Sequence, residues 1–211
     1  MRRARSGANE ESDERRVPAS RGRGEVREKA SRFLGFAARA DSTRAAEEIL
    51  ESLRREYHDA THVAFAWKIG AGPDASRRFS DAGEPAGTAG KPIAGAIEAS
   101  DVTDVVAAVV RYFGGTRLGT GGLARAYRLA AARAIAAAGT ERVFDTVGVE
   151  VRSPYDRVGR VRRLLEPPSV RLKSERFTPE PVFELEVRRS RLPSLLAALK
   201  EGRLSYRICD L

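Results

Sequence analysis

Two acidic residues lie three positions apart in a stretch crowded with glycine and proline. The sequence SDAGEPAGTAGKPI, residues 80–93, carries Asp81 and Glu84 and then Lys91. Neither a helix nor a strand tolerates this density of glycine and proline, so we predict an ordered loop. Two carboxylates in such a loop can perform acid/base chemistry or hold a divalent cation through water. The commoner alternative is that they cap a helix beginning near Pro92.

A second glycine-rich stretch, RYFGGTRLGTGGLARAY at residues 111–127, separates a β-branched run from an alanine-rich run. A strand, a glycine loop and a helix in this order present free N–H groups at the helix N-terminus, where they attract an anion. Arg111, Arg117 and Arg125 add positive charge there. The spacing matches neither G-x-x-x-x-G-K-S/T nor G-x-G-x-x-G. The alternative is therefore a tight turn with close helix packing.

Outside these two loops, few residues are of types that bind metals, form disulfides or act as catalytic groups. Cys209 is the only cysteine, and His58 and His62 are the only histidines. We therefore expect no disulfide, no metal site and no bound cofactor. No nucleophile, base and orienting group adjoin one another in the sequence. Phe65 and Trp67 are expected in the core, since stacking on nucleobases would require an exposed sheet face.

The elements that position these loops follow from hydrophobic periodicity. Residues 31–40 and 61–70 are typical of strands, and residues 42–59 form an amphipathic helix with Ser42 or Thr43 as its cap. The nearly continuous apolar run at 101–113 predicts a strand covered on both faces. A helix is expected from Gly122 to Gly139.

The length favours two modest domains, which we place at residues 30–145 and 146–211. The second carries a β-α-β-β-α-β pattern, which is typical of a ferredoxin-like domain. Residues 1–29 contain few aromatic or β-branched residues, so we predict a disordered basic tail.

The net charge of +9 is distributed unevenly: residues 1–29, 30–145 and 146–211 carry +3, +1 and +5. A basic tail and a basic last third favour a polyanionic partner such as nucleic acid. The alternative is that the base composition of the genome alone causes this excess of arginine. No run approaches the ~18 apolar residues of a membrane span, and the N-terminus lacks the pattern of a targeting peptide. We therefore expect a cytoplasmic protein without a membrane partner.

The loops together resemble the IMPACT/YigZ family, which is related to the mammalian imprinted IMPACT protein. The resemblance is carried by DAGEPAGTAGKP and RYFGGTRLGTGGLARAY, with support from SRF at 31–33 and DATH at 59–62, and covers about residues 30–140. The family often has a second aspartate where this chain has Ala82. A pair of adjacent aspartates is therefore absent here.

The motif positions are carried over residue by residue. The first motif falls on Asp81, Gly83, Glu84, Pro85, Gly87, Thr88, Ala89, Gly90 and Pro92. The second falls on Arg111, Tyr112, Phe113, Gly114, Gly115, Leu118, Gly119, Gly121, Gly122, Leu123, Ala126 and Tyr127.

The resemblance implies an α+β protein: an N-terminal domain of the ribosomal protein S5 domain 2-like fold and a ferredoxin-like C-terminal domain. Eukaryotic family members regulate translation by interfering with activation of the kinase that phosphorylates an initiation factor during amino-acid starvation. Bacterial members are suspected of binding nucleic acid or ribosomes.

From this we expect a non-enzymatic, translation-associated protein that binds RNA or the ribosome. Lys91, Arg111, Arg117 and Arg125 are its expected phosphate contacts. One alternative is an enzyme acting on a small phosphorylated or carboxylated metabolite, with Asp81 or Glu84 as candidate catalytic residues. Another is a module that binds a regulatory protein partner. The same scaffold hosts different functions, so the fold alone does not choose among them.

Overall fold

The computed structural model describes residues 13–209. These residues divide into two compact units. The N-terminal unit is Arg15–Val143, and the C-terminal unit comprises residues 144–209 together with Asp13 and Glu14. Each unit builds its own sheet and helices, so each is described separately.

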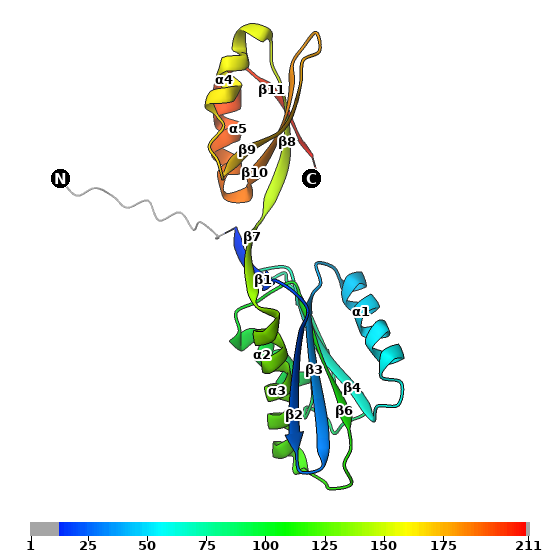
Figure 1. The fold of residues 1–211 in the computed structure, drawn as a ribbon. Coiled ribbons are helices and arrows are strands. Elements are labelled where there is room, and N and C mark those ends of the chain that lie inside the picture. Colours follow the sequence, from blue (N-terminus) through cyan, green and yellow to red (C-terminus); the bar gives the residue numbers. More distant parts are fainter. Residues whose placement is uncertain (1–12, 210–211) are drawn as a thin grey trace, which may run out of the picture. The chain divides into compact units, whose positions relative to one another are not determined.

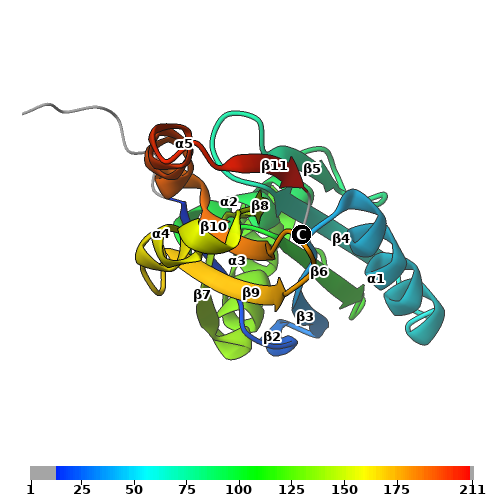
Figure 2. The ribbon, with the colours of Figure 1, turned by 90° about the horizontal axis from the view of Figure 1, so that it is seen from above.

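The N-terminal unit is built on a five-stranded antiparallel sheet with strand order β2-β3-β6-β4-β5. The strands are β2 (Gly22–Glu28), β3 (Ser31–Arg39), β4 (His62–Ile69), β5 (Ser76–Ser80) and β6 (Val105–Tyr112). Helices α2 (Gly90–Ala99) and α3 (Gly119–Ala138) cover one face, and α1 (Thr43–Glu56) lies on the other (Figure 1). Figure 2 shows α1 beside β4 and β6.

Hydrophobic cores fill both faces of this sheet. On the α2 and α3 face, Phe33 meets Tyr127 edge to face with ring centroids 5.1 Å apart. On the α1 face, Phe65 and Trp67 stack 5.5 Å apart and are buried, which confirms their expected core role. Every residue of β6 up to Arg111 is buried, as predicted for a strand covered on both faces.

The expected elements of this unit are confirmed with small changes in their ends. The side chain of Ser42 accepts a hydrogen bond from the Ala45 amide and caps α1. Helix α3 begins at Gly119, three residues before the expected Gly122. Strand β5 was not expected, because its sequence SRRFS is charged and mostly exposed, as an edge strand can be.

The prediction of a disordered tail over residues 1–29 is wrong for its described part. Residues 14–18 form β1 (Glu14–Pro18), which pairs with β7 (Thr140–Phe144), and residues 22–28 form the edge strand β2. The composition misled because few apolar residues are needed here: Val17 and Val26 enter the core, and glycines of β2 lie against α3. Residues 1–12 lie outside the described residues.

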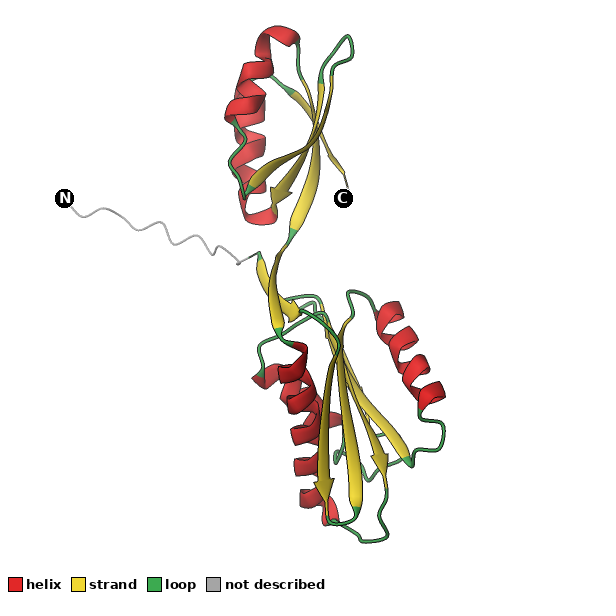
Figure 3. Ribbon diagram, in the orientation of Figure 1, coloured by secondary structure: helices red, strands yellow, loops and turns green. Residues whose placement is uncertain are grey.

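The C-terminal unit has a four-stranded antiparallel sheet with strand order β11-β8-β10-β9. Its elements are β8 (Thr146–Arg152), the 3-10 turn η1 (Tyr155–Arg157), α4 (Val158–Arg163), β9 (Val170–Arg176), β10 (Val182–Arg188), η2 (Arg189–Arg191), α5 (Leu192–Glu201) and β11 (Ser205–Cys209). Both α-helices lie on one face of the sheet (Figure 3), around a core that includes Phe183 and Leu185. The protein is a mixed α/β protein.

Candidate functional site

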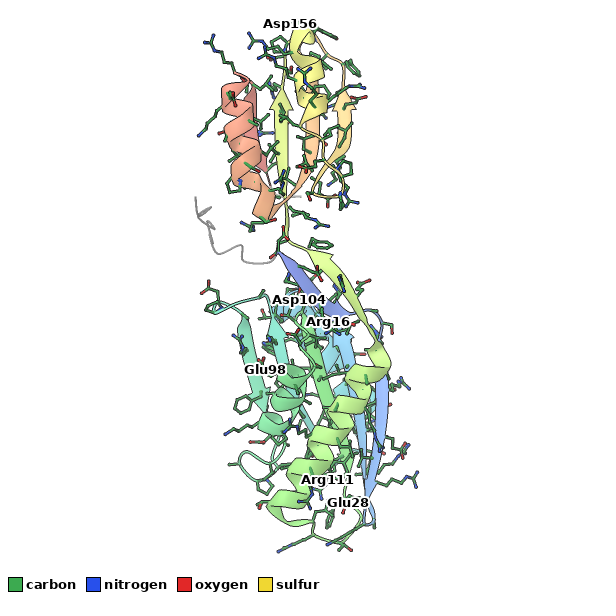
Figure 4. The ribbon with its side chains drawn as sticks, turned by 90° about the vertical axis from the view of Figure 1, so that its left-hand side faces the viewer. Arg16, Glu28, Glu98, Asp104, Arg111 and Asp156 are labelled. Atoms are coloured by element: carbon green, nitrogen blue, oxygen red, sulfur yellow. The ribbon has the colours of Figure 1, made fainter. Side chains whose placement is uncertain are left out.

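The two sequence motifs meet at one end of the N-terminal sheet. Arg111 ends the buried part of β6, and His62 opens the neighbouring strand β4. Side chains alternate along a strand, so Arg111 shares the face of Val109, which α2 and α3 cover. The loop carrying Glu84 crosses this face, and Tyr127 reaches it from α3. Figure 4 shows Arg111 near the start of α3.

A buried ion pair forms the centre of the site. Glu84 Oε1 accepts hydrogen bonds from Arg111 Nη1 at 2.6 Å and from the Tyr127 hydroxyl at 2.7 Å. The side chains of Glu84 and Arg111 are only 2% and 7% exposed. Burial, and then the hydrogen bond to Glu84, raise the pKa of Tyr127 far above its usual range. Tyr127 is therefore a fixed hydrogen-bond donor at neutral pH.

Arg111 is held on more than one side. Its guanidinium lies 5.4 Å from the ring centroids of both Phe33 and Phe113, within the range of cation–π attraction. Its Nε atom is buried and has no hydrogen-bond partner among the described residues. Arg111, which the sequence suggested as a phosphate contact, is buried, and its charge is paired with Glu84 inside the fold.

His62 also faces this ion pair, although it was not among the predicted site residues. Its Nδ1 lies 2.9 Å from the carbonyl oxygen of Ala82. A carbonyl only accepts hydrogen bonds, so Nδ1 carries the hydrogen and Nε2 points toward the site. Nε2 lies 3.9 Å from Glu84 Oε1. The DATH motif was the signal that could have found His62.

Asp81 adopts the capping role that the sequence left open. Its Oδ1 accepts from the amides of Ala89 and Gly90, where α2 begins, and its Oδ2 accepts from Gly87. Burial alone raises the pKa of Asp81, but the three backbone hydrogen bonds outweigh it and hold the pKa below its ordinary value. With both oxygens engaged, Asp81 stabilises the loop that carries Glu84.

Replacing Asp81 with asparagine is expected to lower the stability of the N-terminal unit by about 1–2 kcal/mol at pH 7, because an amide nitrogen cannot accept the Gly87 hydrogen bond. The folded state favours ionised Asp81, so its contribution is complete above the ordinary pKa of about 3.9 and is lost as pH falls through the lower folded pKa. Urea unfolding between pH 7 and pH 3 should therefore show that the free energy of unfolding falls less at acid pH in Asp81→Asn than in wild type. The exposed Asp74→Asn should behave as wild type, and an equal loss in both variants would contradict the capping role.

The second glycine loop is tied down by the supporting motifs. The Gly114 amide donates to Ser31 Oγ at 3.2 Å, and the Phe113 amide donates to Thr61 Oγ1 at 3.1 Å. The Tyr112 hydroxyl donates to Asp59 Oδ1 at 2.8 Å. The SRF and DATH stretches thus fix the end of β6 from two neighbouring segments. A Cβ at Gly114 would lie 2.0 Å from the backbone of Ala30, so only glycine fits there.

Between the motifs lies an open hollow of about 440 Å³. Its polar lining includes His62, Glu84, Arg111, Arg117 and Thr120. Its apolar lining includes Pro85, Phe113 and Leu118. The lining includes the first residues of α3, a helix start that has no side-chain cap. The first N–H groups of a helix have no partner within the helix, and here residues of that first turn line an accessible space beside the exposed Arg117.

The other expected contact residues lie outside this lining. Lys91 and Arg125 are exposed on α2 and α3. Within the described part of the chain, no three His, Cys, Asp or Glu side chains cluster in a way that could hold a metal ion. No helix in that part is long and apolar enough to cross a membrane.

Comparison with known proteins places this fold and site in a recognised class. The chain matches the Impact N-terminal domain over residues 29–135, a range that includes both motifs. It is 42% identical over 139 residues to the IMPACT family member YigZ of Escherichia coli (strain K12), covering 65% of this chain and 68% of that protein. It is 31% identical over 187 residues to an IMPACT family member of Haemophilus influenzae, covering 87% and 91%.

The similarity extends to a whole solved structure. A crystal structure of a hypothetical protein is 31% identical, covers 94% of this chain and 97% of that chain, and has a TM-score of 0.66. The molecule is thus a two-unit α/β protein whose N-terminal unit contains the match to the Impact N-terminal domain. The chain belongs to the IMPACT family, as the resemblance of its loops predicted.

Proposed function

We propose that this protein is a translation-associated regulator that binds RNA or the ribosome, and that the hollow beside the glycine loop receives a phosphate group. The observation that carries the proposal is the meeting of the uncapped α3 N-terminus with exposed Arg117. Phosphate oxygens accept hydrogen bonds from helix N-termini and from arginine without reading sequence. The buried pair of Arg111 and Glu84 then holds this surface in shape.

The fold of each unit supports the same proposal. The element order β8-α4-β9-β10-α5-β11 with sheet order β11-β8-β10-β9 supports a ferredoxin-like C-terminal unit. We propose that the N-terminal unit has the ribosomal protein S5 domain 2-like fold, on the basis of its antiparallel sheet with α2 and α3 on one face. These are the two folds that the resemblance to the IMPACT/YigZ family implied, and eukaryotic members of that family regulate translation.

Basic residues of the C-terminal unit extend the proposed footprint. Arg160, Arg163, Arg189 and Arg203 are exposed and have no ion pair among the described residues. By contrast, the arginines of the open sheet face are matched by glutamates, as in the pairs Arg171–Glu186 and Arg176–Glu184. The unpaired charges therefore lie mainly around the helices, and each can release counterions on contact with phosphate.

The double variant Arg117→Ala, Arg125→Ala tests this proposal. Co-sedimentation with ribosomes across roughly 50 to 200 mM salt should show weaker binding and a salt slope shallower by about 1 for each lost phosphate contact. Arg44→Ala is the matched control, because Arg44 is an exposed arginine on α1, across the sheet. An unchanged affinity and slope in the double variant would remove the hollow from the binding surface.

A second candidate function is favoured by the hollow itself. Its volume of about 440 Å³ suits a small phosphorylated or carboxylated metabolite, and Glu84 and His62 would face such a ligand. A thermal-shift screen distinguishes the two: a ligand at a hundredfold excess over Kd stabilises its target by about 2.7 kcal/mol. A metabolite that shifts wild type but not Arg117→Ala, together with absent ribosome binding, would favour this candidate.

A further inference from the structure

Two large aromatic side chains lie exposed at one end of the C-terminal unit, outside the site described above. Tyr155 in η1 is 58% exposed, and Phe177, directly after β9, is 56% exposed. Their rings stack with centroids 6.5 Å apart and an angle of 25° between planes. Figure 4 labels Asp156, the neighbour of Tyr155, at this end of the C-terminal unit. We call Tyr155 and Phe177 the aromatic pair.

The aromatic pair is held in place by the fold. The Tyr155 hydroxyl donates to the carbonyl oxygen of Thr178 at 3.0 Å, which ties η1 to the segment after β9. Phe177 also meets the buried Phe183 edge to face, with centroids 6.5 Å apart. Both rings therefore keep their orientation while more than half of their surface faces solvent. A fixed aromatic surface loses little conformational entropy when it binds a flat partner.

The charges around the aromatic pair favour a polyanion. Arg157 follows in the same turn, and its Nη1 donates to the backbone of Arg203 at 3.2 Å. Arg160 and Arg203 are exposed, and neither has an ion pair among the described residues. The opposing charges are Asp156, whose carboxylate lies 3.9 Å from Arg157 Nε, and the exposed Glu180, three residues after Phe177. Exposed rings beside arginines are the combination with which proteins bind single-stranded nucleic acid.

We propose that the aromatic pair stacks on unpaired nucleobases of single-stranded RNA, while the neighbouring arginines contact the phosphates. The inference rests on the proposed function and names the part of the RNA that the C-terminal unit recognises. Every base has a flat apolar face, so this contact carries little sequence preference. Double-stranded RNA hides those faces in its own stack and should bind only through its backbone.

The test compares two probes of equal charge in the full-length protein: a short oligouridylate and an abasic ribose-phosphate oligomer of the same length. Wild type should bind the oligouridylate more tightly. The double variant Tyr155→Leu, Phe177→Leu keeps apolar bulk but removes the rings, and should bind the oligouridylate about tenfold more weakly or worse. Its binding of the abasic oligomer should not change.

Two further variants keep the result clear. Tyr155→Leu alone leaves the contact between Phe177 and Phe183 intact, so it separates lost stacking from misfolding and should show a partial loss. Phe79→Leu removes a ring that is 53% exposed in the N-terminal unit and should bind both probes as wild type does.

The outcomes separate this inference from the proposed function. Equal oligouridylate binding by wild type and by the double variant would overturn the stacking role while leaving RNA binding in place, and would turn attention to a protein ligand for the aromatic pair. If wild type bound neither probe nor ribosomes at low salt, both the inference and the proposed function would fail. A selective loss for the oligouridylate supports both.

Discussion

Replacing Glu84 with alanine is expected to destabilise the N-terminal unit by about 3–5 kcal/mol, the cost of removing one partner from a buried ion pair. Without Glu84, the guanidinium of Arg111 is buried without a counter-charge, and the Tyr127 hydroxyl loses its acceptor. A desolvated charge of this kind costs far more than an exposed salt bridge contributes. The loss approaches the total stability of many domains, about 5–15 kcal/mol.

Urea unfolding monitored by tryptophan fluorescence measures this effect in the N-terminal unit. Trp67 is the only tryptophan of the chain and lies buried in the N-terminal unit. Tyr127→Phe should cost about 1–2 kcal/mol, because it removes one hydrogen bond and leaves the ion pair. Glu180→Ala, at an exposed glutamate of the C-terminal unit, should leave the transition unchanged. A Glu84→Ala protein as stable as Glu180→Ala would show that the ion pair does not hold the site.

Replacing Gly35 with alanine is expected to destabilise the same unit by about 3 kcal/mol or more, at the upper end of the cost of overpacking a core. A Cβ at Gly35 would lie 2.2 Å from the carbonyl oxygen of Ala130 in α3. Gly35 pairs with Gly24 on β2 and with Val109 on β6, so the strand cannot move away without disturbing the sheet centre. Helix α3 would have to shift, and it carries Tyr127 and the start of the hollow.

Gly95→Ala provides the matched control. Gly95 lies inside α2, and apart from its chain neighbours and the adjacent backbone of α2 no atom lies within 4 Å of the Cβ that would be added. Alanine there should stabilise the unit by about 0.5–1 kcal/mol through helix propensity. Opposite signs for the two substitutions in the same urea assay would support close packing of α3 on β3. Equal and small effects would contradict it.

The β-α-β-β-α-β order of the C-terminal unit, the helix α1 and the buried strand β6 were predictable from the sequence because each follows from local periodicity. The glycine loops were recognisable for the same reason, since crowded glycine and proline exclude regular structure at short range. Strands β1 and β2 were missed because contacts with residues far away in the sequence hold these segments in place. Val17 and Val26 enter a core, and the β2 glycines allow α3 to approach.

In the candidate site, too, local features were predictable from the sequence, whereas contacts between distant residues were not. The sequence alone identified the two loops, their arginines and the carboxylates Asp81 and Glu84, and it left open whether a carboxylate caps a helix. Only the tertiary structure decided that Asp81 is the cap and that Glu84 pairs with Arg111 and Tyr127, which lie 27 and 43 residues away. The strand order β3-β6-β4 brings these segments together. Arg111 is buried there and its charge is paired with Glu84, because a charge removed from water must be paired within the fold. Arg117 lies at the surface.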